Sequence, residues 1–141
     1  MKVWLLDTGP IVAYLDADDP FHDVAAKALD DFNGQLITSG AVVTEAMHFV
    51  SADFRGPGLL VDFFHSSRTR VVECCQPEDL KQAVRLMKKY ADTPMDFADA
   101  TLVLLAEALR QNHVCTLDRR GFSAYRTATG RHFNLALDLS G

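Results

Sequence analysis

The segment "KVWLL" (residues 2–6) decides the fold, because nearly every side chain in it is apolar. A strand with one face in water alternates apolar and polar residues, whereas a strand covered on both faces carries a near-continuous apolar run. We therefore predict a buried strand at these positions. It ends at Asp7, and the following "TGP" (residues 8–10) predicts a turn, for which a preceding aspartate is ordinary.

Outward from this strand, short apolar runs alternate with segments of helical periodicity. The further predicted strands are 35–38, 70–74, 113–117 and 132–137. The predicted helices run from Asp19-Pro20 to about Phe32, over 40–50, 56–67 and 77–90, and within 93–107. This alternation implies parallel strands joined by right-handed crossovers. We predict an α/β fold, a three-layer α/β/α sandwich with a small central parallel sheet, in a single domain spanning residues 1–141.

The composition is that of an ordinary globular domain, with 48% hydrophobic and 23% charged residues among 141. No apolar run approaches the roughly 18 residues that a membrane span needs, so we expect no membrane partner. Three cysteines, two of them adjacent, give neither a disulfide framework nor the paired spacing of a zinc site. We therefore expect a reduced, cytoplasmic location.

The charge of the chain is unevenly distributed along the sequence. The net charge of −5 weighs weakly against a nucleic-acid partner. Residues 1–33, however, contain seven aspartates and two lysines, whereas residues 110–141 contain five arginines and two aspartates. This distribution allows an acidic site to lie beside a basic rim.

Five carboxylates fall where open parallel sheets bind their ligands, near the carboxyl ends of strands. Asp7 ends the first predicted strand and Asp118 follows the fourth. Glu45 lies in the helix after the second strand, on an otherwise apolar stripe where a charge needs a partner. Asp96 and Asp99 are three positions apart, so a helix places both on the same side.

Each of these acids, taken singly, has a structural explanation. The strand-end aspartates could begin turns, and the glutamate could extend to solvent. Thr93, Pro94 and Asp96 match the N-cap, the first position and the acidic third position of a helix. Asp99 fits such an explanation least, because in that frame it lies past the first turn and gains little from the helix dipole.

Taken together, the acids point to a metal. Four or five carboxylates would gather at one sheet edge with no lysine among them. Packed side by side they repel one another and raise each other's pKa values unless a cation neutralises them. Oxygen ligands of this kind suit Mg²⁺ or Mn²⁺, so we predict a divalent metal site.

Four segments of the chain resemble PIN-domain proteins, and most of all the ribonuclease toxins of VapC-type toxin–antitoxin pairs. They are "VWLLDTGPIVAYLDADDPFH" (3–22), "TSGAVVTEAMHFV" (38–50), "TPMDFADATLVLLAE" (93–107) and "VCTLDRRGFSAYR" (114–126). The segments occur in the family's order and extend over nearly the whole chain. The resemblance implies an α/β/α sandwich and a Mg²⁺- or Mn²⁺-dependent ribonuclease that cleaves phosphodiester bonds.

The resemblance also implies roles for individual residues and for partners. The catalytic, metal-binding acids would be Asp7, Glu45, Asp99 and Asp118, with Asp96 as an additional or outer acid and Thr8 and Thr116 as hydroxyl residues near the metal. The implied partners are an RNA substrate, a cognate antitoxin protein that blocks the site and a second copy of the chain in a homodimer.

Arginines near the last acid are candidates for binding RNA. Arg119, Arg120 and Arg126 could contact phosphates, in which case the affinity for RNA should fall steeply with salt. The first two directly follow Asp118, so a solvated ion pair with that aspartate explains them equally well.

Two other functional classes also place acids at a sheet edge. A phosphoacceptor domain of the receiver type needs an aspartate at the end of the third strand and a lysine near the last. Here "RVVECC" (70–75) ends without aspartate, and no lysine follows Lys89. A non-catalytic PIN-like module that binds RNA or protein would keep the fold while its metal site stayed idle. A nuclease assay with metal present separates that module from an enzyme.

Overall fold

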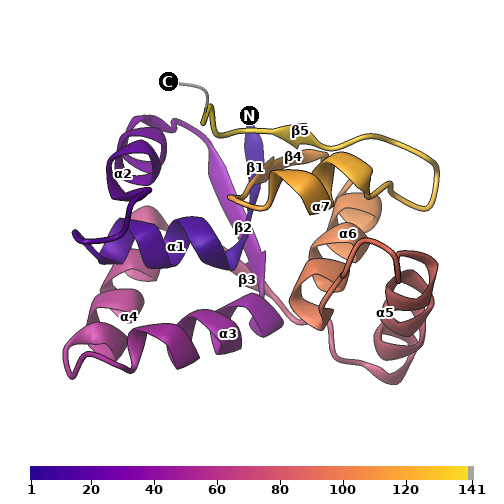
Figure 1. Cartoon of the computed structure of the whole chain (residues 1–141), viewed down its shortest axis with the longest axis horizontal. Helices are drawn as coiled ribbons and strands as arrows, with labels where there is room; N and C mark the ends of the chain where they lie inside the picture. The colour runs from indigo at the N-terminus through magenta and orange to yellow at the C-terminus, as the bar shows by residue number, and fades with distance from the viewer. Residues whose placement is uncertain (140–141) are drawn as a thin grey trace.

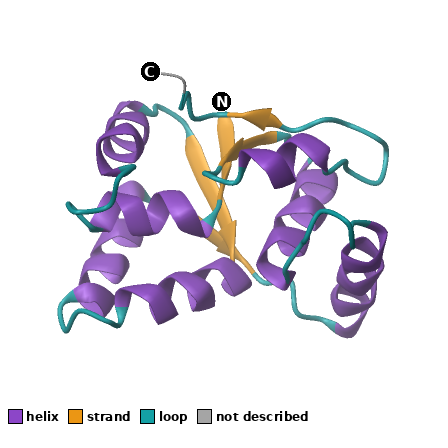
Figure 2. Cartoon of the chain, in the orientation of Figure 1, coloured by secondary structure: helices purple, strands orange, loops and turns teal. Residues whose placement is uncertain are grey.

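A computed structural model describes residues 1–139 and contains one five-stranded parallel sheet. The strands lie in the order β3 (Arg70–Val72), β2 (Gln35–Ser39), β1 (Val3–Leu6), β4 (His113–Cys115) and β5 (Asn134–Leu135). Every neighbouring pair is parallel, with Leu5 of β1 opposite Ile37 of β2 and Val114 of β4. The sheet lies between two groups of helices (Figure 2).

Seven helices connect and cover the strands in the described part of the chain. They are α1 (Thr8–Leu15), α2 (His22–Asp31), α3 (Gly40–Val50), α4 (Gly56–Ser67), α5 (Pro77–Lys89), α6 (Phe97–Leu109) and α7 (Arg119–Ala124). Helices α1 to α4 gather on one side of the sheet and α5 to α7 on the other (Figure 1). Right-handed crossovers require this division, because the chain moves from β1 to β3 in one direction and then returns through β4 to β5. The predicted three-layer α/β/α sandwich is confirmed.

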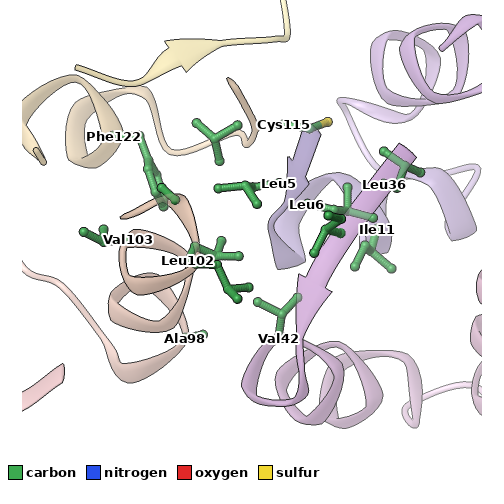
Figure 3. Close-up of a cluster of buried hydrophobic side chains, with 14 of the residues drawn as sticks. Leu5, Leu6, Ile11, Leu36, Val42, Ala98, Leu102, Val103, Cys115 and Phe122 are labelled. Carbon is green, nitrogen blue, oxygen red and sulfur yellow. The ribbon is translucent and has the colours of Figure 1, made fainter. Parts of the chain in front are cut away.

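The hydrophobic core explains why β1 reads as a continuous apolar run. Leu5 and Leu6 are fully buried, and helices from both sides of the sheet contribute to the same cluster, including Ile11 of α1 and Leu102 of α6 (Figure 3). Burial of a leucine side chain contributes roughly 1.5–3 kcal/mol. A central strand covered on both faces therefore keeps apolar residues at successive positions.

The prediction of a turn at residues 8–10 is wrong, because these residues form the first turn of α1. Pro10 is compatible with that position, since the backbone N–H groups of the first turn have no partner within the helix. Asp7 is the N-cap, and Ile11 and Ala13 face the core. A proline and a glycine after a strand suggested a turn, but burial of "IVAYL" (residues 11–15) decided in favour of a helix.

Two predicted helix starts also differ from the structure. Helix α2 begins at His22 rather than at Asp19-Pro20, because these residues form a turn in which Asp19 Oδ1 accepts the backbone N–H of Phe21 at 2.8 Å. Helix α6 begins at Phe97, with Asp96 as its N-cap. Asp99 is therefore the third helical residue and lies inside the first turn, not beyond it.

The C-terminal part of the chain departs from the prediction in detail. The segment "RRGF" (119–122) begins the short helix α7, which the sequence did not predict, and the predicted strand at 132–137 is reduced to β5. All three cysteines are free, as expected, and Cys74 and Cys115 are buried. Among the described residues, no helix combines the length and apolar character that crossing a membrane requires.

Candidate metal-binding active site

The predicted acids lie where the chain reverses its direction across the sheet, between β1 and β4. Ligands of open parallel sheets bind at such a switch point, outside the carboxyl ends of the strands. Asp7 follows β1, Asp118 follows β4, and Asp96 precedes α6. Each of the three is the N-cap of a helix, and each carboxylate accepts a backbone N–H of that helix. Capping thus fixes the backbone of these acids at the edge of the sheet.

The Asp7 carboxylate has one further partner besides the backbone N–H that it caps. Asp7 is only 7% exposed, and its Oδ1 accepts the N–H of Thr8 at 2.8 Å. Its Oδ2 accepts the hydroxyl of Thr116 at 2.7 Å. The same hydroxyl oxygen accepts the N–H of Asp118 at 3.0 Å. Thr116 therefore links the acids at the ends of β1 and β4, which supports its expected place beside the site.

Asp96 and Asp99 form a reciprocal capping box at the start of α6. Asp96 Oδ1 accepts the N–H of Asp99 at 2.8 Å, and Asp99 Oδ2 accepts the N–H of Asp96 at 3.2 Å. This arrangement satisfies two backbone donors at a helix start. The capping box explains why two aspartates lie side by side at the helix start. It uses only one oxygen of each carboxylate.

These acids line one cavity of about 480 Å³. Its lining residues are Asp7, Thr8, Gly9, Val12, Asp19, Glu45, Phe49, Asp96, Asp99, Leu117 and Asp118. Six of them are acids, and no lysine, arginine or histidine is among those described. The structure thus brings all five predicted acids to one place, from four separate parts of the sequence.

The crowding of carboxylates has clear electrostatic consequences. Burial raises the pKa of Asp7 to about 6, and hydrogen bonds from Thr116 and Thr8 only partly oppose this effect. The pKa of Asp99 rises to about 8, first because of burial and then because of the charges of Asp7 and Asp96. Burial also raises the pKa of Glu45. Without a counter-charge, the site therefore holds protons that isolated carboxyl groups would release.

The donor set of the cavity fits a divalent cation. All of its charged groups are carboxylates, which are the ligands that Mg²⁺ and Mn²⁺ prefer. Thr8 Oγ1 is buried and makes no hydrogen bond of good geometry within the described residues, although it lies near enough to Glu45 to lower the pKa of that carboxyl. In the described part of the chain, no three or more His, Cys, Asp or Glu side chains already stand as a ligand group. Charge and chemistry fit the ion, and the side chains would adjust around it.

The predicted arginines lie outside the cavity lining. Arg119 Nη1 donates to the carbonyl of Leu137 at 2.9 Å, and Arg126 Nη1 donates to two carbonyls of its own neighbourhood. Arg120 is exposed. Within the described residues, no ion pair joins Arg119 or Arg120 to Asp118. Their contact with RNA stays a prediction.

Sequence reasoning missed Asp19 as a member of the cavity. It was assigned to a helix start, whereas the loop between α1 and α2 folds back and brings its side chain to the acids. The only available signal was the density of aspartates at positions 16, 18 and 19. The sequence did not single out Tyr125 either. The structure places this residue near the acids, since burial and then the charges of Asp99 and Asp118 raise the pKa of its phenol.

Comparison with known proteins places this architecture in a family. Residues 4–128 match the model of the PIN domain, so the chain belongs to the PIN-domain family. Among its relatives, ribonuclease VapC26 of Mycobacterium tuberculosis is 31% identical over 132 residues, which are 93% of this chain and 98% of that protein. The predicted resemblance to VapC-type PIN proteins is confirmed.

A solved structure supports the fold independently. The crystal structure of Mycobacterium tuberculosis VapC20, titled a sarcin–ricin loop cleaving toxin, superposes with a TM-score of 0.75. The match extends over 84% of this chain and 91% of that chain, at 18% sequence identity. At this identity the likeness concerns the fold alone.

Proposed function

We propose that this chain is a metal-dependent ribonuclease that hydrolyses phosphodiester bonds of RNA, and that it is the toxin of a toxin–antitoxin pair. The observation that carries the proposal is the cavity lined by six carboxylates without a basic side chain among the described lining residues. A relative of nearly the same length named ribonuclease VapC26 supports the choice of RNA.

The acids divide into those that would hold the ion and those that would support them. Asp7, Asp99, Asp118 and Glu45 are the proposed ligands of Mg²⁺ or Mn²⁺, and Asp96 is an outer or additional ligand. A divalent ion bound by carboxylates supplies positive charge to the phosphodiester transition state and increases the acidity of the attacking water.

Hydroxyl groups orient this ligand set. Thr116 donates to Asp7 Oδ2 and accepts from the backbone of Asp118, so it fixes the orientation of the first carboxylate relative to the second acid-bearing segment. Such outer partners orient ligands and tune a metal site. The buried hydroxyl of Thr8, which has no hydrogen bond of good geometry within the described residues, would donate to Glu45.

The proposed partners follow from the same family membership. They are RNA as substrate, an antitoxin protein that blocks the cavity and a second copy of this chain in a homodimer. Arg119, Arg120 and Arg126 are the proposed phosphate contacts around the acidic cavity.

The test is cleavage of a structured RNA by the purified chain with Mn²⁺ or Mg²⁺. We expect Asp99→Asn and chelator each to abolish cleavage, because the substitution removes a ligand charge while leaving an oxygen that can still cap α6. The matched control is Asp79→Asn. Asp79 is the corresponding residue in the capping box of α5 but does not line this cavity, so that variant should cleave normally.

Two results would overturn the proposal in different ways. Full activity of Asp99→Asn would remove the carboxylate mechanism. A wild-type chain that binds RNA in the presence of metal but never cleaves it would instead identify a non-catalytic binding module.

A further inference from the structure

Tyr125 joins two segments that carry acids of the cavity. It is the C-cap residue of α7 and is fully buried. Its hydroxyl donates to the carbonyl of Pro94 at 2.8 Å, across 31 positions of sequence. Pro94 lies two residues before Asp96, the N-cap of α6. The phenol therefore connects the end of α7 to the segment that sets the start of α6.

The same hydroxyl also lies beside the start of α7. A Cβ atom placed on Gly121 would come closer than 3.0 Å to both the Tyr125 hydroxyl oxygen and Asp118 Oδ2. The two oxygens thus share the space above the Gly121 backbone. The Gly121 N–H donates to Asp118 Oδ1 at 3.0 Å and so orients that carboxylate. The Tyr125 hydroxyl therefore lies next to the residue that orients Asp118.

Among the described residues, the hydrogen bonds of the acids themselves do not join α7 to α6. Thr116 couples Asp7 to the backbone of Asp118, and these two residues follow the neighbouring strands β1 and β4. The capping box holds Asp96 and Asp99 to each other only. Among the described hydrogen bonds, the one from Tyr125 to Pro94 is the connection between α7 and the residues just before α6.

We infer that Tyr125 is a positioning residue, whose hydroxyl fixes the separation between Asp118 on α7 and the Asp96–Asp99 pair on α6. The inference rests on the proposed metal-dependent function. Ring packing alone does not require the hydroxyl, since the Tyr125 ring is held by Tyr90 and Phe122, each with centroids 5.1 Å away. Phenylalanine at this position would keep the packing and release the two acid-bearing segments.

The chain offers a matched control for this substitution. Tyr90 is a neighbouring phenol whose oxygen accepts the backbone N–H of Arg126 at 2.9 Å, and it does not line the cavity. Tyr125→Phe and Tyr90→Phe each remove one hydroxyl with one hydrogen bond. A purely structural role predicts similar behaviour of both variants in every measurement.

The experiment is a calorimetric titration of the full chain with Mn²⁺, without RNA. We expect Tyr125→Phe to bind Mn²⁺ about 10-fold more weakly, the order found when outer-shell partners of metal ligands are removed. Tyr90→Phe should bind like the wild type. In cleavage assays, raising the Mn²⁺ concentration should restore the activity of Tyr125→Phe. A second readout is amide hydrogen exchange of the metal-free protein in chelator. Exchange at the backbone N–H groups of Asp99 and Gly121 should be faster in Tyr125→Phe than in the wild type, and unchanged in Tyr90→Phe.

The outcomes separate this inference from the function on which it rests. If the wild type binds Mn²⁺ and cleaves RNA while Tyr125→Phe binds Mn²⁺ as tightly as Tyr90→Phe, only the positioning role is overturned. If the wild type itself binds no Mn²⁺, the proposed function fails and the inference falls with it.

Discussion

Single residues in this site carry two tasks at once. Asp7, Asp96 and Asp118 each cap a helix, and each also turns its carboxylate toward the common cavity. A cap stabilises a helix by about 1 kcal/mol whichever residue of the capping class provides it. Capping therefore explains why an acid, asparagine, serine or threonine is tolerated at these positions, but not why all three are acids. Their convergence on one cavity supplies the second reason.

At the residue scale, Gly121 provides a test of how closely the site is packed. Gly121→Ala would push a methyl group against Asp118 Oδ2, so the carboxylate must move. We expect at least about a 10-fold loss of Mn²⁺ affinity with a small change in stability, because the end of a side chain yields more easily than backbone. Calorimetric titration with Mn²⁺ and urea denaturation measure the two effects.

The control for that substitution is Gly58→Ala in α4, where a new Cβ meets nothing within 4 Å. Alanine in a helix is favoured over glycine by roughly 0.5–1 kcal/mol, so this variant should be slightly more stable and should bind Mn²⁺ normally. Equal Mn²⁺ affinity in the two variants would contradict the packing argument.

Whole elements were predicted with uneven success, and the failures share a cause. The helix 40–50 was predicted at its observed bounds, since Ser39 caps it and the apolar periodicity is clear. Helix α1 was missed because local turn residues outweighed the burial that stabilises it. Helix α7 has only six residues and rests on the Asp118 cap and on Phe122, which is buried beneath it. Short elements of this kind are stabilised by tertiary packing rather than by propensity.

At the element scale, two substitutions of Asp96 separate its capping of α6 from the effect of its charge on stability. Asp96→Ala removes the cap and should lower the free energy of unfolding by about 1 kcal/mol. Asp96→Asn keeps a capping oxygen and removes a charge that destabilises Asp7 and Asp99, so its stability in chelator should equal or exceed that of the wild type. Urea denaturation with chelator compares the three proteins. A loss in the asparagine variant as large as in the alanine variant would show that the charge itself stabilises the helix.

In the molecule as a whole, the carboxylates at one edge of the sheet repel one another. Four segments bring their acids together because β1 and β4 are neighbours in space, although about 110 residues separate Leu6 from Cys115. The folded chain confines charges that the unfolded chain would keep apart. Proton binding, or a cation, relieves that repulsion.

At this scale we predict that the metal-free protein loses stability as the pH rises from about 4 to about 8. The folded pKa of Asp7 is about 6 and that of Asp99 about 8, against 3.8 for either group unperturbed. The folded state therefore binds more protons than the unfolded state in this window, so stability falls with rising pH. The shift of Asp7 corresponds to roughly 2–3 kcal/mol; Asp99 is partly exposed and adds less than its shift suggests.

Urea denaturation in chelator at several pH values measures this dependence. Asp7→Asn should flatten the curve, and Mn²⁺ should restore the stability of the wild type at pH 8, because an ion bound to the folded state stabilises it. A wild-type stability that increases with pH across the window would contradict the assignment of raised pKa values.

The sequence by itself determined the fold class, the long helices and the identity of the five predicted acids. These depend on local apolar periodicity, on capping residues and on the carboxyl ends of strands, all of which are short-range properties of the chain. Only the tertiary structure decided that Asp19 joins the cavity, that Tyr125 stands between two acid-bearing segments and that Gly121 leaves room for Asp118. Those facts depend on which distant segments share space, and that is fixed by the packing of both helical layers against the sheet.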